Sequence, residues 1–142
     1  MLDEKEKTRR LIRELKIEIK VKYVGLLDQE KLYQVYLMSD LLIVPSIWPD
    51  NAPNVICEAL ACGLPVIATN VGGLSELIHN EENGFLVPPK DPKAIAVKID
   101  HLLNHPEILQ KMRQKVKEFS KNISLKDYTK KLLKIYTFQS DD

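Results

Sequence analysis

Apolar residues along this chain fall into two patterns: short continuous runs, and longer stretches in which they recur every three or four positions. The continuous runs favour buried strands, whereas the spaced positions favour helices with one apolar face. Strands are therefore predicted at residues 40–46, 64–70 and 85–87, and the short stretch VKYVG at 21–25, which ends in a glycine, is predicted as a fourth. Helices are predicted at residues 3–15, 28–38, 53–62 and 75–79, and from Asp91, Pro106 and Ser124 onward.

The alternation of helices with continuous apolar strands indicates parallel pairing, because each helix returns the chain to the same end of the sheet. We expect an α/β fold with a parallel sheet of about four strands, helices on both faces and a helical C-terminus. Within a single domain of 142 residues, residues 1–19 would form an N-terminal helix, 20–90 the α/β core and 91–142 the C-terminal helices.

Composition narrows the class of protein. The chain is 44% hydrophobic and 29% charged, which is ordinary for a soluble domain. No apolar run approaches the roughly 18 residues that a membrane span requires, and the charged start differs from a signal peptide, so a cytoplasmic location is expected. Cys57 and Cys62 would lie roughly 8 Å apart on a helix, too far for a disulfide, and no metal site is predicted.

One acidic residue, Glu58, stands in the apolar part of the segment PDNAPNVICEALACG, residues 49–63. We expect this part to form a helix that is buried all round, where an ionised carboxylate costs several kcal/mol unless something pairs with it. Glu58 could pair with a core arginine or lysine, or its face could be exposed to solvent. Alternatively, it could accept hydrogen bonds from a ligand.

The loop before this helix favours a ligand, because ligands of parallel sheets gather where the strands end, here near Pro45–Ser46 and Thr69–Asn70. Residues 51–54 would add free backbone N–H groups at the helix start, which favours phosphate or another oxygen-rich group. Asp50 lies eight residues before Glu58, so two carboxylates would flank these donors. Such a site suits a polyol that carries phosphate, and we interpret it as a nucleotide-sugar site.

Beyond this segment, the sequence as a whole resembles the retaining family-4 glycosyltransferases, the group 1 enzymes with the GT-B fold. The resemblance is to their C-terminal, donor-binding domain and covers residues 20–136 in the order and spacing of that family. It implies a partial Rossmann-like domain that binds a UDP- or GDP-hexose as substrate and needs no further cofactor. The motifs that carry it are VKYVG, DLLIVPS, PNVICEALACGLPVIATNVGGLSELI, NGFLVPP and KKLLKIY.

The resemblance implies a role for each residue of the loop and helix. Glu58 takes the place of a glutamate that holds the ribose diol, because a carboxylate can accept two hydrogen bonds from neighbouring hydroxyls. Asp50 takes the place of a catalytic glutamate that faces the sugar, although aspartate is one methylene shorter. The donor loop continues through Asn51, Ala52, Pro53 and Asn54, and the backbone N–H groups of its first two residues would meet the sugar hydroxyls.

Two glycine positions are also matched. Gly25 and Leu26 lie where the family places its nucleobase, and Gly72 and Gly73 resemble its glycine turn beside the donor. An ordinary tight turn explains these glycines equally well, since glycine readily adopts positive φ.

Parts of the family's pattern are missing from the sequence. These are a loop whose arginine and lysine neutralise the pyrophosphate, and the acceptor-binding domain. We therefore expect the chain to be inactive alone and to need an N-terminal half or a second copy of itself. The sheet would also have a gap, which direct pairing of residues 21–24 with 41–45 could close.

Two other functions stay open. The chain could be a non-catalytic module that binds a nucleotide sugar or a protein partner. Its C-terminal arm, with 9 basic and 2 acidic residues between Gln110 and Tyr136, could hold it at a membrane surface as a peripheral protein. Solvated helix faces explain these lysines as well. Nucleic acid is not predicted as a partner, because aromatic residues are not interleaved with the basic ones.

Overall fold

A computed structural model describes residues 4–49 and 53–122 of the chain. It divides into two compact units, one up to Lys31 and one from Leu32 onward. The first unit contains α1 (Glu4–Glu14) and η1 (Glu18–Lys20), and α2 (Gln29–Met38) begins in it. The second unit contains β1 (Leu42–Val44), α3 (Asn54–Ala61), β2 (Val66–Thr69), α4 (Leu74–Leu77), β3 (Gly84–Val87), α5 (Pro92–Asn104) and α6 (Pro106–Asn122).

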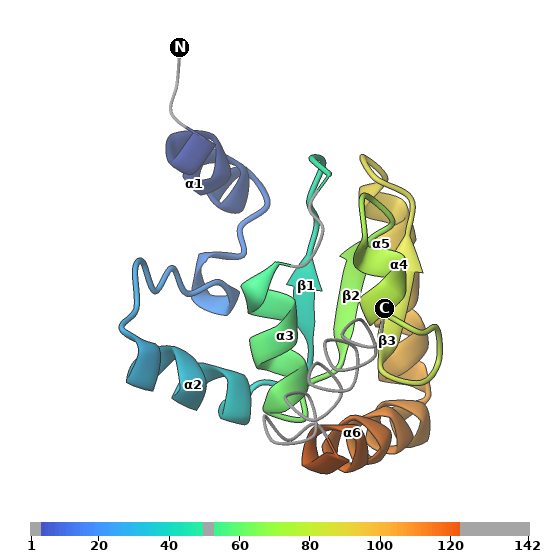
Figure 1. Cartoon of the computed structure of the whole chain (residues 1–142). Helices are drawn as coiled ribbons and strands as arrows, with labels where there is room; N and C mark the ends of the chain where they lie inside the picture. Colours follow the sequence, from blue (N-terminus) through green and yellow to red (C-terminus); the bar gives the residue numbers. More distant parts are fainter. Residues whose placement is uncertain (1–3, 50–52, 123–142) are drawn as a thin grey trace, which may run out of the picture. The chain divides into compact units, whose positions relative to one another are not determined.

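Within the described residues, the second unit has one three-stranded sheet in the order β1-β2-β3 (Figure 1). Both strand pairs are parallel, with Leu42 opposite Val66 in the first pair and Val66 opposite Gly84 in the second. The three strands therefore end at the same edge of the sheet. This confirms the α/β class and the parallel pairing that the sequence predicts.

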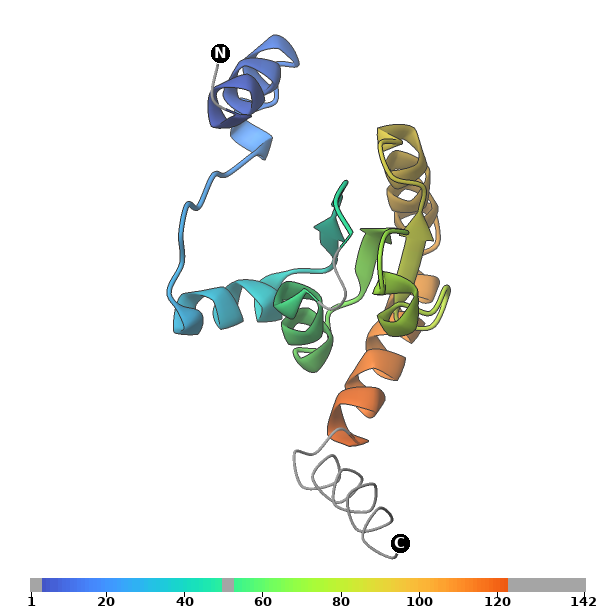
Figure 2. The same ribbon diagram turned by 45° about the horizontal axis from the view of Figure 1, so that its top comes forward.

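Alternate side chains of β2 point into two different cores. Val66 and Ala68 join a cluster that includes Ile56 of α3, whereas Ile67 joins a cluster that includes Leu102 of α5. Accordingly, α3 and α5 lie on opposite faces of the sheet (Figures 1 and 2). Every residue of β2 is buried, as expected of a strand that is covered on both faces.

Helix α6 contributes to both cores and contacts the segment that leads into β1. Val116 belongs to the cluster on the α3 side, and Met112 belongs to the cluster on the α5 side. The guanidinium of Arg113 donates to the Asp40 carboxylate at 2.7 Å and to the Ser39 carbonyl at 3.0 Å, just before β1. Because this charged pair is partly exposed, it orients the helix more than it stabilises the fold.

The predicted strand at residues 21–25 is wrong. This segment has no strand pairing, and the side chains of Val21, Tyr23 and Val24 are exposed. The sheet therefore has three strands in the described residues instead of about four. Tyr23 instead contacts cations of its own unit, with the Lys5 ammonium 4.8 Å from the centre of its ring.

Several predicted helix boundaries are confirmed. The Asp28 carboxylate accepts a hydrogen bond from the Lys31 backbone at 2.9 Å, and Asp91 accepts one from the Ala94 backbone at 3.0 Å. These contacts satisfy N–H groups that the first turn of a helix leaves unpaired. Contacts of Lys31 with its carboxylate also lower the pKa of Asp28. The helix predicted from Ser124 lies outside the described residues.

Helix α3 ends in a Schellman motif at Gly63. The Leu64 N–H donates to the Ala59 carbonyl at 2.9 Å, and the Gly63 N–H donates to the Leu60 carbonyl at 3.0 Å. Gly63 has a φ of 76°, a conformation that glycine adopts without strain. This turn sends the chain directly from α3 into the buried β2.

The turn before β3 is built around the buried side chain of Asn83. Its Oδ1 accepts from the His79 N–H at 2.7 Å, and its Nδ2 donates to the Leu77 carbonyl at 2.8 Å. The next residue, Gly84, lies so close to β2 that a Cβ there would overlap the Val66 carbonyl. These contacts explain why an asparagine followed by a glycine is needed at this turn.

No helix in the described ranges, 4–49 and 53–122, is long and apolar enough to cross a membrane.

Replacing Gly84 by alanine should destabilise the protein by about 3 kcal/mol or more, because the added methyl forces β3 away from β2. The free energy of unfolding would be measured by urea denaturation with circular dichroism. Ser75→Ala, at an exposed position of α4, is the control and should change this free energy by less than about 0.5 kcal/mol. A Gly84→Ala variant as stable as this control would contradict the packing described here.

Candidate functional site

The carboxyl ends of β1 and β2 are tied together by hydrogen bonds. The buried Thr69 hydroxyl, at the end of β2, donates to the Ser46 carbonyl at 2.5 Å. The Ser46 hydroxyl in turn donates to the Trp48 carbonyl at 3.0 Å. These bonds shape the start of the loop that leads from β1 to α3. The sequence predicted both strand ends as part of a site, and the structure brings them together.

Three predicted site residues of this loop, Asp50, Asn51 and Ala52, lie outside the described residues. Pro53 precedes α3 with an extended backbone (φ −65°, ψ 125°), and Asn54 begins the helix. The helix therefore begins one residue later than predicted. In the part of the chain that the structure describes, no side chain caps its start, so the first N–H groups of α3 have no side-chain acceptor there.

Helix α3 is not buried all round, which corrects the expectation from its sequence. Its buried side comprises Ile56, Ala59 and Leu60, whereas Cys57 and Glu58 are exposed. None of the ion pairs formed among the described residues involves Glu58. Among the described residues, Glu58 therefore pairs with no core cation. The alternative of a solvent-exposed face is correct, and the carboxylate remains accessible to a ligand.

Glu58 accepts a hydrogen bond from one side chain of α2. The Tyr36 hydroxyl lies 3.2 Å from Oε2 of Glu58 and donates to it, across 22 positions of sequence. Tyr36 is 5% exposed. Burial, followed by the hydrogen bond to Glu58 and its negative charge, raises the pKa of Tyr36 to about 12. Burial and the same charge also raise the pKa of Cys62.

The three predicted glycines do not all share one backbone conformation. Gly72 has a φ of 57°, so its turn does need a residue that tolerates a left-handed backbone. Gly73 has a φ of −83° immediately before α4, which any residue can adopt. Gly25 has a φ of 68° and Leu26 is exposed, and both belong to the first unit. Donor contacts at all four positions stay predictions.

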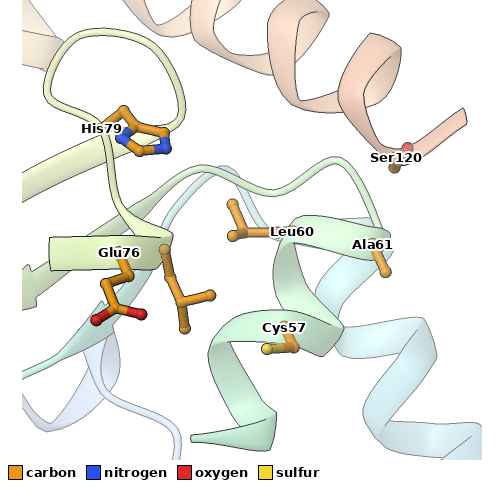
Figure 3. Close-up of a pocket in the computed structure, with 7 residues that line it drawn as sticks. Cys57, Leu60, Ala61, Glu76, His79 and Ser120 are labelled. Atoms are coloured by element: carbon orange, nitrogen blue, oxygen red, sulfur yellow. The ribbon is translucent and has the colours of Figure 1, made fainter. Parts of the chain in front are cut away.

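A cavity of about 290 Å³ lies between α3, the α4 region and the end of α6 (Figure 3). Sequence reasoning missed it, because its walls come from elements far apart in the chain and no local pattern marks them. Glu58 is not among its lining residues, although its neighbour Cys57 is. The lining residues are Cys57, Leu60, Ala61, Glu76, Leu77, His79 and Ser120.

Two further features bear on the predicted partners. Within residues 4–49 and 53–122, no three His, Cys, Asp or Glu side chains gather closely enough to hold a metal ion. In the basic arm, Lys115 lies 3.7 Å from the Glu82 carboxylate. That contact occupies one of the lysines that the membrane interpretation would use, while most of the others lie beyond residue 122.

Residues 2–121 match the family model described as glycosyl transferases group 1. The chain belongs to this family. Among its curated relatives is N-acetyl-alpha-D-glucosaminyl L-malate synthase of Bacillus anthracis, 32% identical over 108 residues. That match covers 76% of this chain and 28% of the relative. The chain spans about a quarter of the length of the curated relatives it matches.

Solved structures agree with this assignment to the glycosyltransferase group 1 family. Sucrose-phosphate synthase from Thermosynechococcus elongatus superimposes with a TM-score of 0.79 at 31% identity, over 96% of this chain and 34% of that one. HepE of Anabaena, in complex with UDP-glucose, has a TM-score of 0.75 at 27% identity, over 81% of this chain and 31% of that one. The fold is therefore that of a GT-B glycosyltransferase domain.

Replacing Glu58 by glutamine should lower the pKa of Tyr36 from its wild-type value of about 12, because the negative charge beside the phenol is removed. The pKa should stay above about 10, the ordinary value for tyrosine, since the ring remains buried. Nuclear magnetic resonance of tyrosine labelled at Cζ would follow the titration, with the exposed Tyr33 as the control.

The same shift predicts how stability depends on pH. The folded-state pKa of Tyr36 is raised above the unfolded value. The stability that the protonated phenol contributes to the folded protein is therefore fully present below about pH 10 and is lost as the pH rises toward 12. If the pKa of Tyr36 were the same in the wild type and in Glu58→Gln, the contact would not exist in solution.

Proposed function

We propose that this chain is the donor-binding part of a retaining glycosyltransferase, and that it binds a nucleotide sugar such as a UDP- or GDP-hexose. Membership of the group 1 family and the likeness to HepE, solved in complex with UDP-glucose, support this proposal. The single observation that carries it is the accessible carboxylate of Glu58, which no lysine or arginine neutralises among the ion pairs of the described residues.

The role that we propose for Glu58 is to accept hydrogen bonds from the ribose hydroxyls of the nucleotide. An ionised carboxylate has about four acceptor positions on its two oxygens. The Tyr36 hydroxyl occupies one position on Oε2, which leaves enough acceptor capacity for a diol. An exposed carboxylate also loses little hydration when a sugar hydroxyl replaces water, so that binding carries a small desolvation cost.

Further residues complete the proposed donor site. Asp50 faces the donor sugar as the catalytic carboxylate, and Asn51 and Ala52 present backbone N–H groups to the sugar hydroxyls. Pro53 and Asn54 bring this loop to the start of α3, which no described side chain caps and where anions are favoured. In the same proposal, Gly25 and Leu26 meet the nucleobase, and Gly72 and Gly73 form the turn beside the donor.

The proposed donor-binding role limits what the chain is expected to do alone. Retaining transfer requires stabilisation of the departing nucleoside diphosphate and an acceptor hydroxyl held against the sugar carbon. We expect the 142 residues by themselves to bind the donor without transferring its sugar. Transfer would need an acceptor-binding half or an equivalent partner.

Replacing Glu58 by alanine should abolish binding of the nucleotide sugar and leave the fold intact, because its side chain is exposed on α3. Isothermal titration calorimetry with UDP-glucose and GDP-mannose would measure the affinity, and circular dichroism would verify the fold. Glu118→Gln, at an exposed glutamate of α6, is the control and should bind like the wild type. An unfolded Glu58→Ala variant, or one that binds as tightly as the wild type, would refute the role of Glu58.

A further inference from the structure

The contact between Tyr36 and Glu58 joins a fixed group to a movable one. Tyr36 is 5% exposed and belongs to the same apolar cluster as Ile56 and Leu60 of α3. Its ring is held by packing on several sides, so the position of its hydroxyl is defined by the core. Glu58 lies at the surface, where a glutamate side chain ordinarily samples several rotamers.

We propose that Tyr36 is a positioning residue for nucleotide binding: its hydroxyl holds Oε2 of Glu58 and so leaves Oε1 free to receive the ribose hydroxyls. This inference rests on the proposed function of Glu58 and extends it to a residue on a different helix. Without a hydrogen bond from Tyr36, the rotamers of Glu58 would be restricted only when the ligand binds, and that restriction would weaken binding. The hydrogen bond at 3.2 Å restricts them beforehand, within the folded protein.

The protonation state of Tyr36 suits this role. Its pKa is raised to about 12, so the phenol keeps its proton across the whole physiological range and remains a donor. A donor of this kind can hold an ionised carboxylate without adding a positive charge. Glu58 therefore keeps its full negative charge for the ligand, which a lysine or arginine at the same place would partly neutralise.

A purely structural role is the competing explanation. A buried tyrosine hydroxyl needs an acceptor, and Glu58 could serve merely to satisfy it. The two explanations differ in one measurable respect. If Tyr36 positions Glu58 for ribose, removal of its hydroxyl weakens ligands that have ribose hydroxyls and leaves ligands without them unaffected. A structural defect would weaken both kinds of ligand together.

The test compares the affinities of UDP, GDP and ADP with those of their 2′,3′-dideoxy forms by isothermal titration calorimetry. For each base, the ratio of the two dissociation constants measures the preference for ribose hydroxyls. The proteins are the wild type, Tyr36→Phe, Glu58→Gln and the double variant, with Tyr33→Phe as the matched control. Tyr33 lies on the same helix and is 53% exposed, so it loses a hydroxyl without disturbing the core.

We expect the wild type and Tyr33→Phe to prefer the ribose forms, and Tyr36→Phe to reduce that preference about three- to tenfold, the effect of immobilising one side chain. Glu58→Gln should reduce it at least as much. The double variant should be no worse than Glu58→Gln, because both changes act through one carboxylate. Affinities for the dideoxy forms should be the same in all five proteins.

A second variant keeps the test independent of any folding defect in Tyr36→Phe. 4-Aminophenylalanine at position 36 retains a hydrogen-bond donor at the same place, and it should restore the preference for ribose. If Glu58→Gln loses that preference while Tyr36→Phe keeps all of it, Tyr36 has no positioning role and the proposed function stands. If the wild type shows no preference for ribose with any base, the ribose-binding role of Glu58 and this inference both fail.

Discussion

Strand β2 is the constraint on which the rest of the second unit depends. All of its residues are buried, and it pairs along one edge with β1 and along the other with β3. A strand in this position can only be satisfied by two neighbours for its backbone and two apolar layers for its side chains. Helices α3 and α5 supply those layers from opposite faces. The parallel register then brings the three strand ends, and the loops that follow them, to one edge of the sheet.

The position of Glu58 follows from that arrangement. Helix α3 buries Ile56, Ala59 and Leu60, which recur at helical spacing, and this turns Glu58 outward. The neighbouring α2 then places a core tyrosine at its carboxylate, so an exposed acidic group is held by a buried donor. The energetic question that the sequence raises, how an apolar helix tolerates a charge, has a simple answer. The charge is in water and costs the fold little, and it remains available to a ligand.

The candidate site could be predicted from sequence in its chemistry more than in its geometry. The motif around Glu58 indicated the family, which the family match confirms. The same motif misled on burial, because Cys57 and Ala61 are apolar by composition but small enough to stand exposed on a helix. The contact with Tyr36 could not be predicted either. It spans 22 positions and depends on how α2 packs against α3, for which neither segment carries a local signal.

Local chemistry was sufficient wherever an element's own residues complete its bonding. Asp28 and Asp91 satisfy the first N–H groups of their helices from within the same turn, and the Asn83–Gly84 turn is likewise marked by its residue types. A strand cannot complete its bonding in this way, because the partners of its backbone hydrogen bonds lie in another segment of the chain. Strands formed in three of the predicted segments, each paired with a neighbouring strand: 40–46, 64–70 and 85–87. Residues 21–25 carry three apolar side chains but have no strand pairing. Whether such a segment forms a strand is decided by a partner that only the tertiary structure supplies.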